Sequence, residues 1–580
     1  MSNAALDTFK SRDDLKIFGS AGLGLFALQL KLGIEDISQI GVNSVVDGGD
    51  DKKADIIYLD QEQEIAVIIQ SYISISTKHR KEAKANKASD LNTAMAWLFE
   101  DPNGLDFPER LKPHAKELQR SLLDGEIKTI YIWYVHNLNG SDNVKRELKV
   151  VERSTQAHIK SVLKIDSVKI IAEEIDQKIL EEWYEAISTP ILIKDTLRLP
   201  IDGGFSVKGP DWKAFVTSIS LTWLHSIFKK YGQRLFSANI RDYLGSRDRD
   251  ENINNNIRQT AETDANKFWI YNNGITILVD KIIEQKPDSL TISGISIVNG
   301  AQTTGAVGNL TKRPNKKAAV QVRFIESSSR DTILGIVKFN NSQNKTIAPD
   351  HKSNDKTQKR LETEFLKVSD LKYLRRRGGT EELIKRKKNA LPSIVASQAL
   401  AAFHGDPYTA YHRKTKIWTE DDLYMKYFST HTTAAHIFVA YSLLKAVEKK
   451  KLELSHKSKV GQLTETEEEQ FGFLKNRGSV ILLTSAIASC SEIILGKKIP
   501  NLFRLQFSKK LTFDKTIGYW LPIVNSSIAF SSYLLKGLKD GTLDKDLSLD
   551  TMKEFRSLMQ STREVNATVY DRFSSKLKLG

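Results

Sequence analysis

Cysteine is nearly absent from this sequence, and long hydrophobic runs are missing as well. Cys490 is the one cysteine among 580 residues, so the chain cannot form an internal disulfide, and its apolar surroundings predict a buried structural thiol. No apolar run approaches the roughly 20 residues needed to cross a bilayer. The first residues lack the basic and then apolar segments of a secretory signal. We therefore expect a cytoplasmic protein with no membrane partner.

Acidic residues are too few to balance the basic ones. Lys and Arg number 86 against 71 Asp and Glu, which gives a formal charge of +15. Such an excess favours a polyanionic partner, most simply nucleic acid, either DNA or RNA. The densest basic segment lies within residues 371–390 and contains Arg375, Arg376, Arg377, Lys385, Arg386, Lys387 and Lys388. The alternative for this segment is a solvated loop and helix face.

The length of the chain exceeds what one hydrophobic core supports, so we expect two to four domains. Residues 1–190 alternate helix and strand patterns, which predicts an α/β domain. Its expected strands are 54–60, 64–76, 129–139 and 167–175, and its expected helices are 22–38, 86–100 and 144–164. Residues 191–410 have short strands and many Asn and Gly residues, which predicts an α+β domain. Residues 411–580 repeat apolar residues at helical spacing, which predicts a helical domain.

One pair of predicted strands carries a pattern with chemical meaning. Asp55 begins the first strand, and Gln70 lies near the end of the second. An acid on one strand and an amide on the next are oxygen donors suited to a hard cation, Mg²⁺ or Mn²⁺. Such a metal polarises a phosphate and activates water. The alternative reading of Asp55 is an ordinary turn residue at a strand end.

This frame resembles the Mrr-like branch of the PD-(D/E)xK nucleases, a group of restriction-endonuclease-like domains. The resemblance implies that Asp55 and Gln70 bind the metal and that a lysine follows two positions after Gln70. Tyr72 occupies that position instead. Either the lysine has moved to the following helix, where Lys84 and Lys87 are candidates, or the domain is a degenerate fold that only binds. Glu35 and Asp36 are candidates for an assisting upstream acid.

Side-chain amides recur beside glycines in the middle part of the chain. They occur in four separated stretches. The candidate ligand-binding residues of these stretches are Asn239, Arg241, Asn272, Asn273, Gly274, Asn299, Gly300, Gln302, Thr303, Asn340, Asn341, Gln343 and Lys345. A single Asn-Gly turn needs no function. The repeated set is suited to a phosphate, a nucleotide or a base and sugar, because amides both donate and accept and glycine allows close approach to the backbone. A buried structural network is the alternative.

The motifs "NIRDYLG", "FWIYNNGITI", "IVNGAQTTGA" and "NNSQNKTIAPDHKSND" together resemble the AIPR family, named for abortive infection and phage resistance. The resemblance covers roughly residues 230–420. It implies an antiphage defence protein, with the nuclease-like domain before the AIPR domain. The leading hypothesis is a metal-dependent nuclease. One alternative is a non-catalytic sensor of nucleic acid or of a nucleotide. The other is an enzyme in which the amide-rich stretches line a cleft that acts on a nucleotide. A second copy of the chain is a further candidate partner.

Overall fold

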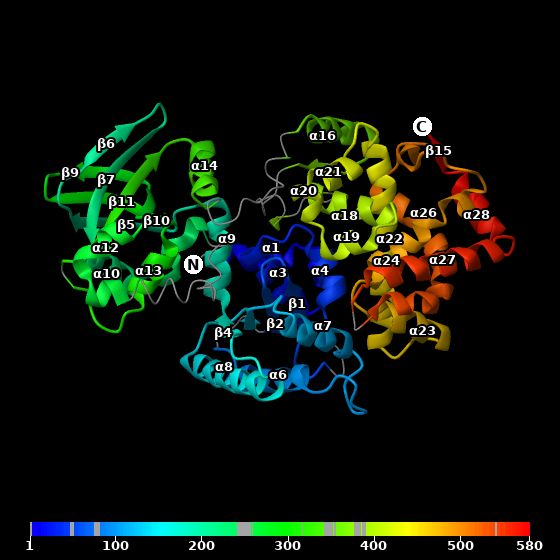
Figure 1. The fold of residues 1–580 in the computed structure, drawn as a ribbon, viewed down its shortest axis with the longest axis horizontal. Coiled ribbons are helices and arrows are strands. Elements are labelled where there is room, and N and C mark those ends of the chain that lie inside the picture. Colours follow the sequence, from blue (N-terminus) through cyan, green and yellow to red (C-terminus); the bar gives the residue numbers. More distant parts are fainter. Residues whose placement is uncertain are drawn as a thin grey trace.

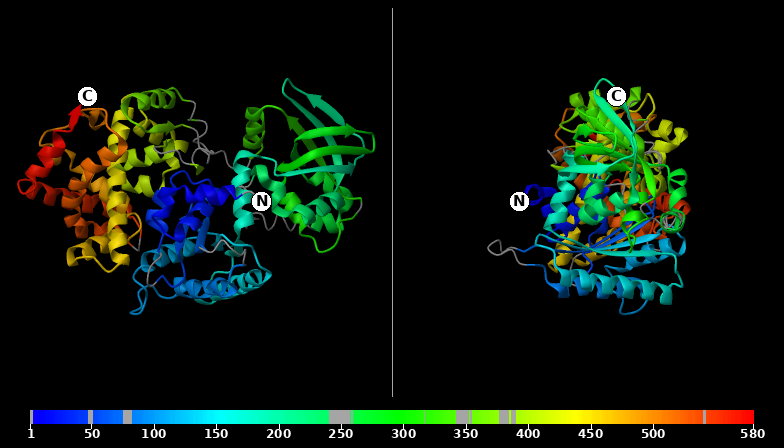
Figure 2. Two further views of the ribbon diagram at one scale, coloured as in Figure 1. Left: turned by 180° about the vertical axis from the view of Figure 1, so that it is seen from behind. Right: turned by 90° about the vertical axis from the view of Figure 1, so that its left-hand side faces the viewer.

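The computed structural model describes residues 3–46, 51–74, 82–239, 257, 259–315, 317–341, 352, 355–375, 384–385, 390–539 and 542–580. These residues form three parts. In Figure 1, a first part with a small sheet lies between a middle part with a larger sheet and a helical part. The view from behind in Figure 2 again places the middle and helical parts on opposite sides of the N-terminal helices. The predicted multidomain α/β and α+β architecture is therefore confirmed at the level of mixed sheets and helices.

The first part is built on a mixed sheet whose strands coincide with the predicted apolar runs. The strands are β1 (Ile56–Asp60), β2 (Ile65–Tyr72), β3 (Thr129–His136) and β4 (Lys169–Ile175). Their order is β1-β2-β3-β4, with β1 antiparallel to β2 and the other pairs parallel. The near-continuous burial of β2 and β3 explains why their sequences are apolar throughout rather than alternating.

Helices cover both faces of this sheet. One face packs on α1 (Ala4–Lys10), α2 (Asp13–Lys16), α3 (Ala21–Leu32), α4 (Ile37–Ser44) and α9 (Gln177–Ser188). The opposite face packs on α5 (Ala85–Ser89), α6 (Leu91–Phe99), α7 (Lys112–Leu123) and α8 (Asp142–Val162). The result is a three-layer α/β/α domain, in which the two apolar clusters are separated by the sheet.

Gly24 allows α3 to lie directly on β1 and β2. A Cβ atom at this position would lie 2.4 Å from Ser71 Oγ and 2.8 Å from Ile56 Cδ1. We expect Gly24→Ala to lower the free energy of unfolding by about 1–3 kcal/mol through overpacking, measured by urea denaturation. Gly518→Ala in α26 (Phe513–Ser527) is the matched control. It meets nothing within 4 Å, so higher helix propensity should leave it equally or more stable. Equal losses in both variants would contradict the close contact.

The middle part contains a curved sheet of seven strands. They are β5 (Ile193–Pro200), β6 (Phe205–Lys208), β7 (Trp212–Ser220), β8 (Ile275–Val279), β9 (Lys281–Gln285), β10 (Ser289–Asn299) and β11 (Ala319–Ser327). The order is β5-β10-β8-β11-β7-β6, and β9 pairs with β10. Within this sheet, β8 and β11 are the one described pair that runs parallel. Its helices are α10 (Leu221–Tyr231), η1 (Gly232–Asn239), η2 (Ala265–Lys267), α12 (Phe268–Tyr271), α13 (Ala301–Gly308) and α14 (Arg330–Asn341).

Helices dominate the third part of the structure, and they include a helix over residues 356–368. Leu361 and Phe365 of the helix 356–368 belong to the same apolar cluster as Ile437 and Phe438. Its helices are α16 (Lys356–Val368), α18 (Ser393–Phe403), α19 (Pro407–His412), α20 (Lys416–Thr419), α21 (Asp421–Tyr427), α22 (Ala434–Lys459), α23 (Glu465–Leu474), α24 (Ser479–Ser489), α25 (Ser491–Leu495), η3 (Leu502–Arg504), α26, η4 (Ile528–Gly537), α27 (Lys545–Ser561) and α28 (Ala567–Ser574). Two small sheets pair β12 (Lys372–Leu374) with β13 (Ala390–Pro392) and β14 (Leu505–Phe507) with β15 (Leu577–Leu579).

Cys490 is buried among these helices, as predicted. Burial raises the pKa of its thiol to about 11, so the sulfur stays protonated and unreactive at neutral pH. None of the helices in the described ranges combines the length and the apolar character needed to cross a membrane.

Candidate functional site

Asp55 and Gln70 lie next to each other at one end of the first sheet. Ile56 of β1 pairs with Ile69 of β2, and continuing this antiparallel register by one residue places Asp55 opposite Gln70. Side chains of directly opposed residues share one face of a sheet, with Cβ atoms roughly 5 Å apart. The Ser71 backbone N–H donates to Asp55 Oδ2 at 2.6 Å, which fixes the carboxylate against the end of β2.

The face that carries this pair is the one covered by α5, α6 and α8. Alternate side chains of a strand point to opposite faces, and Ile57 and Ile68 pack into the apolar cluster on this side. Asp55 and Gln70 follow the same alternation, and Tyr72 packs against that cluster directly. The predicted metal ligands Asp55 and Gln70 therefore lie on the same face of the sheet as Tyr72.

The two candidate lysines differ in where they point. The Nζ atom of Lys87 in α5 lies 5.2 Å from the centre of the Tyr72 ring. Lys84 is exposed at the position preceding α5. Of the two lysines, Lys87 is therefore the one placed near the ends of the strands. Its ammonium group lies over the face of the Tyr72 ring, as in a cation–π contact.

The oxygen atoms of the pair provide a test of whether a divalent cation fits. Gln70 Oε1 is buried and has no hydrogen-bond partner among the described residues, and an unsatisfied buried oxygen favours a ligand. Asp55 supplies a carboxylate beside it. Within the described ranges, no cluster of at least three His, Cys, Asp or Glu side chains could hold a metal. The pair suits Mg²⁺, which binds through one or two carboxylates and keeps water or phosphate as its other ligands.

The same strand ends contain polar residues that the sequence analysis missed. His136 Nδ1 accepts from the Leu138 N–H, so Nε2 carries the proton that it donates to Glu174 at 3.1 Å. The Ser141 N–H also donates to Glu174. The Tyr134 hydroxyl is buried without a partner in the described structure. Burial, and then the neighbouring Tyr72 and Glu174, raise the pKa of Tyr134 above its usual range, so it is a neutral donor.

Asp36 does not belong to this site, contrary to the sequence-based expectation. Its carboxylate caps α4 by accepting from the Gln39 N–H, and it pairs with Lys445 Nζ of α22 at 2.6 Å. Glu35 lies in the same turn. Asp36 is therefore part of the contact between the first part and the helical part.

In the middle part, three of the four amide-rich stretches meet at the start of β8. Asn272 Nδ2 donates to Thr303 Oγ1 at 3.1 Å. Gly274 and Gly300 both have positive φ, and a Cβ on Gly300 would lie 3.2 Å from the Gly274 carbonyl oxygen. The side chain of Asn340 in α14 accepts from Arg323 at 3.1 Å. The amides are thus close together, and part of their hydrogen-bonding capacity is used within the cluster.

Other predicted members of this group remain apart from these contacts or outside the described structure. Asn273 is exposed, whereas Asn299 and Gln302 are half-buried beside the turn at Gly300. Arg241, Gln343, Lys345 and the side chains of Asn239 and Asn341 lie outside the described residues. Arg323 was missed, because a single arginine in a strand has no sequence signature; it donates to both Thr276 and Asn340.

The family model described as "AIPR protein" matches residues 236–532, more than half of the chain. This chain is a member of the AIPR family. Membership indicates a role in abortive infection and phage resistance. No curated protein and no solved structure matches the chain.

The AIPR match begins in η1 and ends in η4. It therefore contains the amide cluster and continues across the predicted boundary at residue 410 into the helical part. The shared core of α16, α18 and α22 accounts for this continuity. The first sheet, with Asp55 and Gln70, lies outside the AIPR match, so the nuclease-like reading depends on the geometry of that sheet alone.

The basic segment of the AIPR region is only partly described. Arg375 Nε forms an ion pair with Glu362 Oε2 at 2.6 Å. Arg376, Arg377, Arg386, Lys387 and Lys388 lie outside the described residues, and Lys385 lies within them. Nucleic-acid contact by this segment stays a prediction.

Proposed function

We propose that this AIPR protein is an antiphage nuclease that uses Mg²⁺ or Mn²⁺ at Asp55 and Gln70 to cleave nucleic acid. The observation that supports it best is the unsatisfied Gln70 Oε1 directly across from the Asp55 carboxylate. A bound cation would polarise the scissile phosphate and lower the pKa of a bound water. The chain itself fixes the carboxylate through the Ser71 N–H and keeps the Tyr134 hydroxyl protonated nearby.

The turn before Asp55 adds support. Lys52 and Lys53 both have positive φ, at 49° and 75°, a conformation that is unfavourable for residues other than glycine. Such strain is concentrated at functional sites. The turn holds two positive charges beside the proposed ligand, where they would attract a phosphate backbone. The AIPR region would bind the nucleic acid, or would sense the nucleic acid or a nucleotide.

A cleavage assay tests this proposal. The full chain is incubated with plasmid DNA, single-stranded DNA and RNA, with Mg²⁺, with Mn²⁺ or with EDTA. We expect cleavage of at least one substrate that requires the cation. Tight binding without cleavage of any of the three would support the second candidate, a non-catalytic sensor. That candidate is favoured by Tyr72 at the lysine position and by the small donor set.

Lys87 should be the lysine that acts on the phosphate. We expect Lys87→Met to reduce the cleavage rate by about 10²–10³-fold, because it removes a positioned positive charge from the reacting phosphate. Lys84→Met, three positions earlier and exposed, is the matched control and should retain nearly full activity. Single-turnover rates distinguish the two. Equal effects, or a larger effect of Lys84→Met, would contradict the assignment of Lys87.

A further inference from the structure

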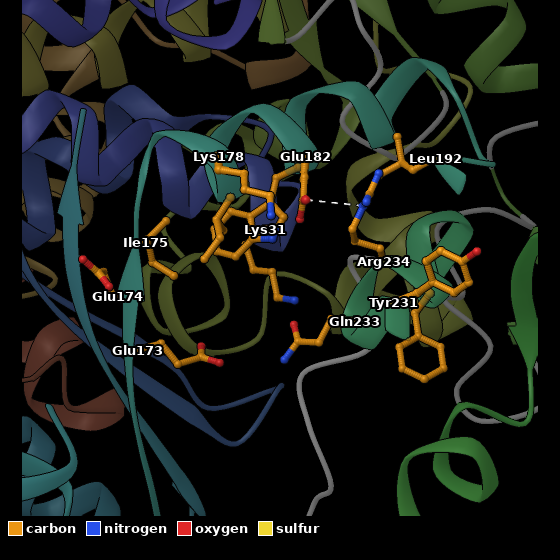
Figure 3. A pocket seen from close by; sticks show the side chains of 13 residues that line it. Lys31, Glu173, Glu174, Ile175, Lys178, Glu182, Leu192, Tyr231, Gln233 and Arg234 are labelled. Atoms are coloured by element: carbon orange, nitrogen blue, oxygen red, sulfur yellow. Dashed lines mark ion pairs between the residues drawn. The ribbon is translucent and has the colours of Figure 1, made fainter. Parts of the chain in front are cut away.

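A cavity of about 320 Å³ lies where the first part meets the middle part. One wall consists of β4, α9 and the end of α3, and the other consists of the end of α10 and η1 (Figure 3). It lies by the edge strand of the first sheet, on the side that α9 covers, whereas Asp55 faces α5 and α8. The size is at the lower end of small-molecule sites, which span roughly 300–1,000 Å³.

Three cationic residues line this cavity, Lys31, Lys178 and Arg234, and Lys31 and Arg234 belong to opposite walls. In Figure 3 the ammonium group of Lys31 points into the space between Glu173 and Gln233. Lys31 is 6% exposed, and its Nζ lies 5.3 Å from the Trp183 ring. Arg234 approaches from η1, and its Nε pairs with Glu182 Oε1 at 3.3 Å. A guanidinium has five N–H donors, so this pair leaves donors of Arg234 for a ligand.

Burial shifts the pKa of three charged groups that line the cavity. Burial lowers the pKa of Lys31, with Glu173 opposing this change, and burial raises the pKa of Glu173, with Lys31 opposing. Burial also raises the pKa of Glu182, opposed by Arg234. Perturbed groups in a cleft are typical of binding sites. An anionic ligand would favour the charged form of Lys31, and a protonated Glu173 could donate a hydrogen bond to it.

The lining also has an apolar part, which includes Ile179, Trp183, Leu192 and Phe236, and its other polar members are Glu174, Lys178, Tyr231 and Gln233. An inorganic anion would leave most of the apolar surface and of the cavity volume unfilled. A sugar phosphate would place its hydroxyl groups against the apolar surface. A flat ring would cover the apolar surface instead. The Gln233 amide, which has both hydrogen-bond donors and an acceptor, would form hydrogen bonds with the polar edge of such a ring.

We propose that this cavity binds a nucleoside monophosphate, with the phosphate between Lys31 and Arg234 and the base against the apolar wall. Because its walls belong to different parts of the chain, the ligand would bridge them and fix their relative position. The site is separate from the proposed nuclease centre, so Asp55→Asn should bind the ligand as the wild type does.

Isothermal titration of the full chain tests this proposal. The probes are AMP, GMP, CMP and UMP, with the four corresponding nucleosides and inorganic phosphate. We expect at least one monophosphate to bind with a submillimolar dissociation constant, and its nucleoside and inorganic phosphate to bind at least ten times more weakly. If no monophosphate binds below 1 mM, or if phosphate alone binds equally well, the proposal is wrong.

Variants locate the binding. Arg234→Gln should weaken the bound monophosphate about 10- to 100-fold, because charge-assisted hydrogen bonds are lost. Gln233→Ala should weaken it less and change the preference among bases. Both positions are exposed, so both variants should melt like the wild type. Lys229→Gln, exposed on α10 and outside the cavity, is the charge-matched control and should bind normally. Equal affinity of Arg234→Gln and Lys229→Gln would overturn the site.

Discussion

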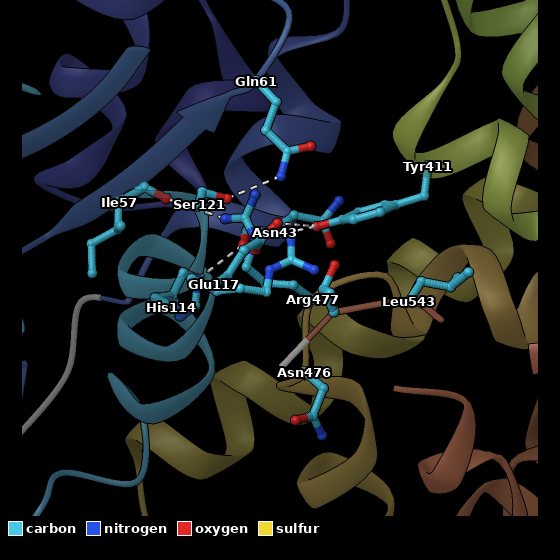
Figure 4. A network of polar contacts seen from close by, with 12 residues as sticks. Asn43, Ile57, Gln61, His114, Glu117, Ser121, Tyr411, Asn476, Arg477 and Leu543 are labelled. Carbon is cyan, nitrogen blue, oxygen red and sulfur yellow. Dashed lines mark hydrogen bonds and ion pairs between the residues drawn. The ribbon is translucent and has the colours of Figure 1, made fainter. Parts of the chain in front are cut away.

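Replacing Arg477 with methionine is expected to lower the free energy of unfolding by about 3–5 kcal/mol, because it leaves a buried carboxylate unpaired. Arg477 lies between α23 and α24 and forms an ion pair with Glu117 of α7 (Figure 4). It also donates to the Tyr411 hydroxyl at 3.2 Å. Arg477 and Glu117 are 8% and 3% exposed at their side chains. The pair joins the first part to the helical part, which share one apolar cluster.

The loss in Arg477→Met should depend on pH. Burial raises the pKa of Glu117, and the Arg477 guanidinium opposes that change. Without Arg477 the pKa rises further. A carboxyl with a raised pKa takes up its proton more readily in the folded state than in the unfolded state, so stability is gained as pH falls through that raised pKa. Urea denaturation should therefore show a smaller difference from the wild type at pH 5 than at pH 8.

Two further variants control this experiment. Arg413→Met removes an arginine whose ion pair with Glu420 is about 40% exposed at both side chains, and it should cost less than about 1 kcal/mol. The double variant Glu117→Met with Arg477→Met should recover much of the loss, because it removes both buried charges. A double variant less stable than Arg477→Met, or a loss independent of pH, would contradict a buried charge pair.

Asp55→Asn is expected to abolish measurable cleavage. The substitution keeps an oxygen that can accept from the Ser71 N–H but removes the negative charge that a divalent cation requires. Loss of metal-assisted stabilisation worth several kcal/mol corresponds to about 10³-fold or more in rate. Single-turnover cleavage of the preferred substrate measures the effect, and thermal melting should show an intact fold.

Asp124→Asn is the matched control for Asp55→Asn, since Asp124 is exposed at the end of α7 in the same part of the chain. It should cleave at the wild-type rate. If Asp55→Asn also cleaves at that rate, the activity comes from another site, and the amide cluster around Asn272 and Thr303 becomes the candidate enzyme site.

Local patterns predicted the first part of the fold well. The apolar runs around Ile57 and Ile68, separated by a polar turn, predicted a pair of strands, and β1 and β2 form this pair in antiparallel orientation. The pairing also placed Asp55 beside Gln70 as expected. The position of Lys87 over Tyr72 depended on how α5 returns to the sheet, which a local pattern does not encode. The sequence therefore left Lys84 and Lys87 equivalent, and packing distinguishes them.

Contacts between residues that are far apart in the sequence were not predicted, and the reason is physical. Glu117 and Arg477 are separated by hundreds of residues, and each looks like an ordinary polar residue in its own segment. The same holds for Lys31 and Arg234, which line one cavity because the middle part packs near β4 and α9. The recurring amides were recognisable because glycines marked their turns.

Cation binding at Asp55 and Gln70 is the central claim, and Mn²⁺ titration followed by electron paramagnetic resonance tests it most directly. The experiment uses the full chain with a phosphorothioate oligonucleotide that resists cleavage and can complete the coordination. The account predicts that the wild type and Asp124→Asn bind Mn²⁺ alike, and that Asp55→Asn binds it at least ten times more weakly. Identical binding by the wild type and Asp55→Asn, or no bound Mn²⁺ in any of them, would contradict it.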